Sequence, residues 1–375
     1  MRVFFAAPAA TRGPTAVGSR LFAIEVLRGV ASSWVVLFHS LSAYPVQTLH
    51  PILQVVHRLS GHGWMGVNIF FAISGWCVAE RVATGHRRGE APGVFLWERV
   101  LRIYPTYWVA LAATFALRLA TLPFNATHAG NLLPDGTRGW AADLLLLNPY
   151  LGVPATLIVS WSLVYELGFY VLAAIGLFLL RRGLSARVLV VLGILLCLWP
   201  RMGYQLRAAY AIDLWPDFLA GVLAWFAARS QQPGKAAIGS IGLGLLALLT
   251  LAWTDGDREA GRIVALATAV ILWGLSGHDS AVFNRPALRS FAWVGGFSYS
   301  LYLIHLSLLS PAMNLSARLV SPQRFAFCLL WLVAVILAMA GGWCLHRMAE
   351  APIERWRKIR WRRPLVPGTA VQSSA

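Results

Sequence analysis

The sequence predicts an all-α integral membrane protein built as a bundle of about ten transmembrane helices. Only 13% of its 375 residues are charged and 58% are hydrophobic, whereas an ordinary soluble domain carries about 25% charged residues. Apolar stretches close to the roughly 20 residues that cross a bilayer recur along the whole chain. These observations exclude a soluble globule, a disordered chain and a fibre.

Ten apolar segments are expected to form the spans. In chain order they cover residues 21–42, 64–82, 101–121, 159–180, 187–200, 212–229, 236–254, 262–278, 291–311 and 325–346. The fifth is short and the sixth contains Asp213, Pro216 and Asp217, which leaves their boundaries open. Between the third and fourth segments, Pro149 and Pro154 interrupt an apolar stretch. We expect a re-entrant or interfacial element there.

The distribution of basic residues predicts the orientation of the bundle. With a cytoplasmic amino terminus, 23 of the 32 Lys and Arg residues fall on the cytoplasmic side and 9 on the other. This bias follows the positive-inside rule and places both termini in the cytoplasm. The net charge of +17 is therefore an orientation signal, and no nucleic-acid partner is expected.

Three regions follow from this plan. Residues 1–20 form a cytoplasmic N-terminal segment, 21–346 the transmembrane domain, and 347–375 a basic cytoplasmic tail that frays into solvent or lies against anionic lipid. The four cysteines lie in apolar segments and none belongs to a Cys-x-x-Cys pair, so we expect neither a disulfide nor a metal site.

Ionisable side chains at membrane depth are costly and mark candidate functional sites. In the first segment, Arg28 and His39 are eleven residues apart, about 16 Å along a helix axis, so they share one face at different depths. Arg28 could instead pair with Glu25 one turn earlier and anchor the cytoplasmic end. His39 could be a hydrogen-bonded interior histidine without a catalytic role.

The second segment carries Asn68 near its outer end and a Ser74-Gly75 step in its middle. Small residues at that depth allow either close helix packing, the commoner explanation, or a thin wall beside a ligand. Arg99 and Arg102 share a face at the start of the next helix. Arginine suits phosphate oxygens, so a phosphorylated cofactor could dock there, with plain positive-inside charge as the alternative.

In the fourth segment, Glu166 is expected about 10 Å inside the outer boundary, where its main basic partners would be His39 and His305. Tyr302 and His305 are one turn apart on the ninth segment and face the same way. The outer half thus gathers these histidines, Glu166 and Asn68. Such an arrangement suits a phosphate-bearing donor held from the cytoplasm and a base nearer the far side, whereas a transporter would more naturally show two related halves.

Six fragments in this order resemble acyltransferase family 3, the integral membrane O-acyltransferases related to bacterial O-antigen acetylases. They are LRGVASSWVVLFHS, NIFFAISGW, ERVLRIYPTYW, SWSLVYELGFY, YSLYLIHLSLL and HRMAEAPIERW. The last resembles the family's terminal Glu-x-Pro element, here Glu350 and Pro352. The resemblance covers about residues 20–360.

The resemblance implies a ten-helix bundle in the bacterial inner membrane. It takes an acyl group from cytoplasmic acyl-CoA, with acetyl-CoA the expected donor and no metal involved. The acceptor is a hydroxyl of a sugar or polysaccharide at or near the extracytoplasmic face. Some relatives carry an appended periplasmic hydrolase-like domain, for which this sequence has no segment. The acceptor's identity, the acyl group, the oligomeric state and the choice between direct transfer and an acyl-histidine intermediate stay open.

The resemblance and the depth pattern together assign roles. His39 is the expected catalytic general base, and Glu166 orients its imidazole or hydrogen-bonds the acceptor. The donor cofactor is assigned to Arg28, Arg99, Arg102, Ser74 and Gly75, and the acceptor to Asn68, Tyr302 and His305. The alternatives are a secondary transporter or carrier of a lipid-linked sugar, and a scaffold that would tolerate loss of His39 and Glu166.

Overall fold

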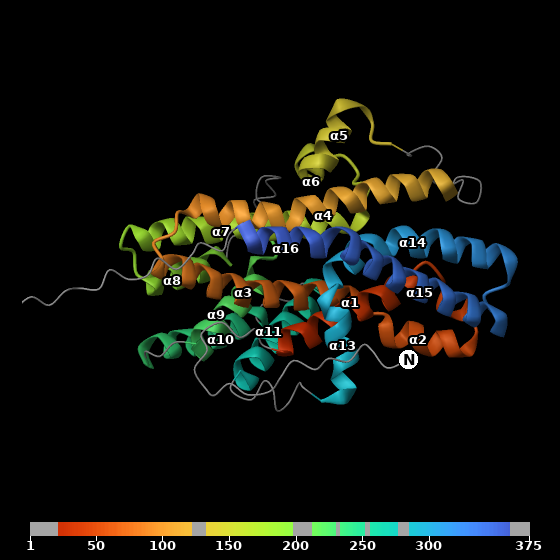
Figure 1. Ribbon diagram of the computed structural model, residues 1–375. Helices are drawn as coiled ribbons and strands as arrows, with labels where there is room; N and C mark the ends of the chain where they lie inside the picture. Colours follow the sequence, from red (N-terminus) through yellow and green to blue (C-terminus); the bar gives the residue numbers. More distant parts are fainter. Residues whose placement is uncertain are drawn as a thin grey trace, which may run out of the picture.

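The computed structural model describes residues 22–121, 133–197, 212–229, 233–251, 256–276 and 285–360. These ranges are built from helices and their connections, without a strand. Most of the long helices run alongside one another, and α13 stands across them (Figure 1). The predicted segment 1–20 and the end of the tail beyond residue 360 lie outside the described residues.

Every predicted apolar segment contains a helix. The long helices are α1 (Phe22–Leu41), α3 (Gly66–Arg87), α4 (Pro92–Thr121), α7 (Trp161–Arg181), α8 (Ala186–Leu196), α9 (Trp215–Arg229), α10 (Pro233–Leu251), α11 (Asp257–Leu275), α13 (Pro286–Gly296), α14 (Ser298–Leu319) and α15 (Phe325–Leu345). Shorter helices are α2 (Pro51–Ser60), α5 (Gly136–Leu145), α6 (Asn148–Leu151) and α16 (Ala351–Arg360). Helix α4 begins at Pro92, nine residues before the predicted start at 101.

Among the described residues, four helical stretches are long and apolar enough to cross a membrane, or five if the bent pair α13–α14 is one span. The four are Phe22–Leu41, Pro92–Thr121, Ile158–Arg181 and Phe325–Ile359. Helix α15 also exposes large apolar side chains at Leu329, Leu332, Val333, Ile336 and Leu337, as a lipid-facing helix does. The fold is that of an all-α, multi-pass membrane protein, and the count of ten spans stays a prediction.

The ninth predicted segment, 291–311, is not one straight helix. Helices α13 and α14 meet at Phe297 and are bent by 73°. Helix α13 packs closely on α1, because β-carbons at Gly29 and Gly295 would overlap the backbone oxygens of Phe291 and Glu25, respectively. The bend places Ser298, the first residue of α14, beside α1.

Helices α3 and α9 also cross at glycines. A β-carbon at Gly75 would overlap the carbonyl oxygen of Phe218, and one at Gly221 would overlap that of Ala72. Two backbones approach this closely only where both helices lack side chains at the crossing. Gly75 therefore packs against α9, the commoner of the two explanations considered for it.

The proline-interrupted stretch between α4 and α7 forms two short helices. Helix α5 and helix α6 lie on the outside of α4 (Figure 1). Tyr104, Tyr107 and Trp108 of α4 donate hydrogen bonds to the carbonyls of Leu145, Asp143 and Leu144, respectively. These side chains satisfy carbonyls that the last turn of α5 cannot pair internally.

The chain stays helical beyond residue 347, the predicted boundary between bundle and tail. Helix α15 continues through a π-helical segment, His346–Glu350, into α16. Helix α16 packs against α4 and against the π-helical segment that precedes it (Figure 1). Residues 347–360 thus belong to the folded bundle, and the tail does not fray from residue 347.

The α3–α9 crossing gives a first prediction. The substitution Gly75→Ala should lower the melting temperature of the protein in detergent, because its methyl group pushes two backbones apart at a cost of about 1–3 kcal/mol. The control is Gly274→Ala on α11, where a β-carbon would meet no atom within 4 Å. That variant should be neutral or slightly stabilising. Equal melting temperatures for the two variants would contradict the packing role of Gly75.

Candidate active site

A cavity of about 570 Å³ runs through the bundle between α1, α3, α4, α7, α14 and α16. Its volume is in the usual range for sites that bind small molecules and cofactors. Along α3 its lining extends from Val67 to Arg81. Val67 and Arg81 are fourteen positions apart, which corresponds to about 21 Å of helix, so the cavity follows most of α3.

One end of the cavity, here called the basic end, is lined by charged residues. Its cations are Arg81, Arg99, Arg102, Arg357 and Lys358. Arg81 is neutralised locally, since it pairs with Glu90 at 2.6 Å and with Glu98 at 2.8 Å.

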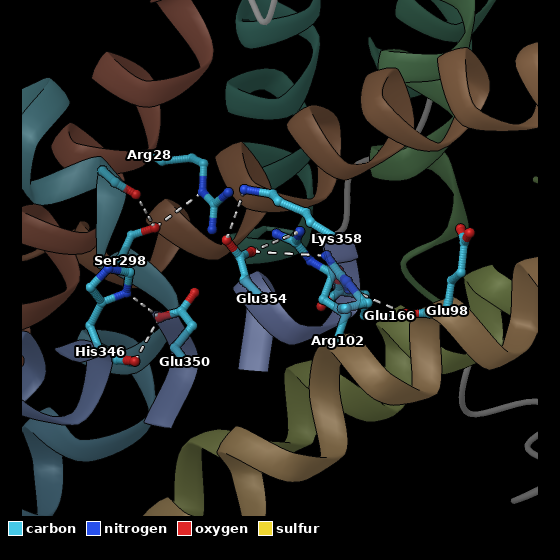
Figure 2. Close-up of polar contacts among 12 residues, drawn as sticks. Arg28, Glu98, Arg102, Glu166, Ser298, His346, Glu350, Glu354 and Lys358 are labelled. Carbon is cyan, nitrogen blue, oxygen red and sulfur yellow. Dashed lines mark hydrogen bonds and ion pairs between the residues drawn. The ribbon is translucent and has the colours of Figure 1, made fainter. Parts of the chain in front are cut away.

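Glu354 of α16 lies among three of these cations. Its carboxylate is 3.9 Å from Arg102, 4.0 Å from Arg357 and 3.9 Å from Lys358 (Figure 2). One carboxylate thus faces three positive charges, so this group keeps a net positive charge that favours an anion. The residues of α16 were missed from the sequence, although the 354/357/358 spacing is typical of one helix face.

Arg99 is held by aromatic faces. Its guanidinium lies 5.1 Å from the ring centre of Phe95 and 5.3 Å from that of Tyr170. Its Nε is buried and has no hydrogen-bond partner. Buried donors are normally satisfied, so this one is an exception beside the cavity.

The middle of the cavity holds Glu166. Its carboxylate accepts hydrogen bonds from Ser74 Oγ at 3.3 Å and from the Tyr170 hydroxyl. Figure 2 places it beside Arg102. The expected pairing of Glu166 with His39 or His305 is not made, since both of its partners come from α3 and α7.

Arg28 reaches the same cavity from α1. Its Nε donates to Ser298 Oγ at 3.1 Å, and Ser298 Oγ in turn donates to the Gly295 carbonyl at 2.9 Å (Figure 2). Ser298 can be the partner of Arg28 because the bend at Phe297 brings the first residue of α14 beside α1. The alternative pairing of Arg28 with Glu25 is not among the hydrogen bonds or ion pairs of the described residues.

Glu350 is a further buried carboxylate on the cavity wall. It accepts from Ser300 Oγ at 2.7 Å and from His346 Nδ1 at 2.9 Å (Figure 2). The π-helical segment that ends at Glu350 adds a residue to the turn, a feature often found at functional sites.

The opposite end of the cavity, here called the histidine end, stops at Val67, Phe70, Ser162 and Tyr302. His39 and His305 lie beyond it. A hydrogen bond of 3.1 Å connects His39 Nδ1 and His305 Nε2. The ring centres of Tyr302 and His305 are 6.0 Å apart. Phe70 and Tyr302, whose ring centres are 6.1 Å apart, are the aromatic side chains of the lining at this end, and Tyr302 is the one beside His305.

The ten candidate site residues thus divide into two groups. Those that line the cavity are Arg28, Ser74, Arg99, Arg102, Glu166 and Tyr302. Those outside its lining are His39, Asn68, Gly75 and His305.

Two residues assigned to the acceptor already have partners within the protein. Asn68 Nδ2 donates to Asp217 at 2.6 Å, and both residues are buried between α3, α9 and α11. The Tyr302 hydroxyl donates to the Val159 carbonyl at 3.0 Å and accepts from Ser162 at 2.8 Å. These polar groups form hydrogen bonds to neighbouring segments of the protein, and neither faces the cavity without a partner.

Comparisons with known proteins agree with this architecture. The family model of the acyltransferase domain of acyltransferase family 3 matches residues 21–347. "Exopolysaccharide production protein ExoZ" of Rhizobium meliloti (strain 1021) is 26% identical over 314 residues, which cover 80% of this chain and 92% of that protein. "Protein 2 in picA locus" of Rhizobium radiobacter is 29% identical over 162 residues, 40% of this chain and 78% of that protein. No solved structure matches.

The family match extends from the first helix of the bundle to the π-helical segment before α16. It includes the two histidines and the cavity lining up to α14, whereas Glu350, Glu354, Arg357 and Lys358 of the lining follow the matched residues. The chain belongs to acyltransferase family 3 and is a membrane O-acyltransferase.

Proposed function

We propose that this enzyme transfers an acyl group from cytoplasmic acyl-CoA, with acetyl-CoA as the donor, to a hydroxyl of a polysaccharide. The name of the Rhizobium meliloti relative, an exopolysaccharide production protein, supports the carbohydrate acceptor. The observation that carries the donor assignment is the cavity itself, which extends about 21 Å from a cluster of cations to the histidine end.

The donor enters at the basic end. Its phosphates bind Arg99, Arg102, Arg357 and Lys358, since guanidinium and ammonium groups recognise phosphate oxygens. Its pantetheine arm follows the cavity, so that the thioester points toward the histidine end. The positive-inside bias supports a basic end on the cytoplasmic side of a bacterial inner membrane, where acyl-CoA is available.

His39 is the general base in this proposal. Its Nε2 takes part in no hydrogen bond among the described residues, so it can accept a proton. As the acceptor oxygen attacks the thioester carbonyl, Nε2 takes the hydroxyl proton. The C–S bond then breaks and the departing CoA thiolate receives that proton. This requires Phe70 and Tyr302 to move aside when the thioester arrives.

Of the two roles expected for Glu166, orienting the imidazole or hydrogen-bonding the acceptor, the residue does not take the first in this proposal. Its hydrogen bonds to Ser74 and Tyr170 fix it in the middle of the cavity, away from the imidazole. There it hydrogen-bonds the ligand that fills the cavity.

The base assignment predicts that His39→Ala lowers kcat by about 10² to 10⁴, the usual worth of general-base help. The assay is release of CoA thiol by purified protein in nanodiscs, dependent on a polysaccharide acceptor. The corresponding ester mass should also disappear from cell-surface glycans. The control is His57→Ala on α2, outside the cavity lining. A folded, inserted His39→Ala protein with full activity would refute the assignment.

The donor assignment predicts that Arg102→Gln raises KM for acyl-CoA by about tenfold or more with little change in kcat, because it removes a charge-assisted phosphate contact. The effect should shrink as salt concentration rises. Arg181→Gln, at the exposed end of α7, is the control. An unchanged KM for Arg102→Gln would place the phosphates elsewhere.

A substitution of opposite sign tests the same cluster. Glu354→Gln removes the carboxylate that competes with phosphate for Arg102, Arg357 and Lys358. The KM for acyl-CoA should fall several-fold, and pyrophosphate should become a stronger competitive inhibitor. Glu259→Gln on α11, outside the cavity lining, is the control. A higher KM in Glu354→Gln would mean that Glu354 holds α16 in place and does not compete with the donor.

A further inference from the structure

The two histidines beyond the cavity form a short chain of hydrogen bonds whose proton positions can be assigned. His305 is fully buried on α14, and its Nδ1 lies 3.1 Å from the Leu301 carbonyl and 2.8 Å from the Tyr302 carbonyl. A carbonyl oxygen can only accept, so Nδ1 of His305 carries a hydrogen.

The remaining nitrogen of His305 is then an acceptor. None of its hydrogen bonds involves a carboxylate. An ionised ring without a counter-ion is costly in a fully buried site, so the ring is neutral. A neutral imidazole carries one N–H, which leaves a lone pair on Nε2.

This lone pair points to His39. Nδ1 of His39 lies 3.1 Å from His305 Nε2 and 3.1 Å from the Val35 carbonyl, and both of these atoms are acceptors. The hydrogen of a neutral His39 is therefore on Nδ1, and its Nε2 keeps the lone pair.

His305 is the stronger of the two determinants. The Val35 carbonyl lies within α1, where it also accepts the backbone N–H one turn later, as in any helix. His305 Nε2 makes no other hydrogen bond in the described part of the chain. Free histidine favours the opposite tautomer, with the proton on Nε2, so an acceptor at Nδ1 is needed to reverse this preference.

We infer that His305 is a positioning residue that holds His39 in the Nδ1–H tautomer, so that Nε2 is available as the base. The inference rests on the proposed function of His39. His305 does not touch the reacting atoms. Once Nε2 has taken the acceptor proton, His305 Nε2 accepts from the Nδ1–H of an imidazolium, and hydrogen bonds to charged groups are stronger than neutral ones. It thus performs with a neutral ring the orienting role that a carboxylate performs in other base–orienter pairs.

The tautomer can be measured without any assay of activity. Nitrogen-15 NMR of histidine-labelled protein in nanodiscs, with His39→Ala used to assign the His39 signals, distinguishes protonated from unprotonated ring nitrogens. In the unsubstituted protein, Nδ1 of His39 should be protonated and Nε2 unprotonated. A protonated Nε2 in the neutral ring would overturn the inference whatever the activity.

Two substitutions test the part played by His305. His305→Leu removes the acceptor and should shift His39 toward the Nε2–H tautomer. The value of kcat should fall by up to about tenfold, and KM for acyl-CoA should stay unchanged. His305→Gln supplies an amide oxygen near the position of Nε2 and should restore the tautomer and most of kcat. His57→Leu is the matched control, and size-exclusion chromatography checks folding.

The outcomes separate the inference from the proposed function. An unchanged tautomer and kcat in folded His305→Leu would overturn the role of His305. Loss of kcat without a change of tautomer, or without recovery in His305→Gln, would also overturn it. Full activity of His39→Ala would overturn the proposed function and leave the tautomer assignment intact.

Discussion

Charged side chains inside an apolar bundle must find partners, and the rest of this structure depends on that constraint. Arg28 of α1 bonds to Ser298 of α14, Glu166 of α7 bonds to Ser74 of α3, and Glu354 of α16 faces Arg102 of α4. Each contact joins two helices that are distant in sequence. The groups that make the cavity polar are therefore also those that fix its walls, and a ligand can compete for them without leaving a charge unpaired.

The two ends of the cavity differ in a way that suits transfer between two compartments. The basic end holds an excess of cations around Glu354, whereas the aromatic side chains of Phe70 and Tyr302 line the histidine end. In the proposed mechanism these two side chains keep water and acceptor hydroxyls from the thioester until the donor is fully bound. The Tyr302 hydroxyl is tied to Ser162 and Val159, so a movement of Tyr302 is coupled to the start of α7.

Hydropathy was sufficient to place the helices, because a bilayer-spanning helix needs a long apolar segment whatever its neighbours are. It could not reveal the bend at Phe297, because α13 and α14 together are long and apolar enough to be one span and the bend depends on the packing of α13 against α1. The cost of buried charge drew attention to Arg28 and Glu166, and the affinity of arginine for phosphate drew attention to Arg102; all three line the cavity, and their roles stay predictions.

The partners of those residues were harder to predict. Tyr170 lies one turn from Glu166 and could have been found by helical spacing, but Ser74 is 92 residues away. Asn68 was expected near the acceptor and instead pairs with Asp217, a contact that only the fold brings together. The basic composition of residues 347–360 predicts a tail in solvent or against anionic lipid, whereas Glu354, Arg357 and Lys358 of α16 line the cavity.

The central claim is that one ligand spans the molecule from the arginine cluster to His39. Cryo-electron microscopy of the protein in nanodiscs with a thioether analogue of acetyl-CoA tests it most directly. The account predicts phosphates at Arg99 and Arg102, Phe70 and Tyr302 displaced, and the acyl carbonyl within hydrogen-bonding reach of the space beside His39 Nε2. An analogue bound outside the cavity, or one whose acyl group ends at Glu166 with Phe70 and Tyr302 in place, would contradict it.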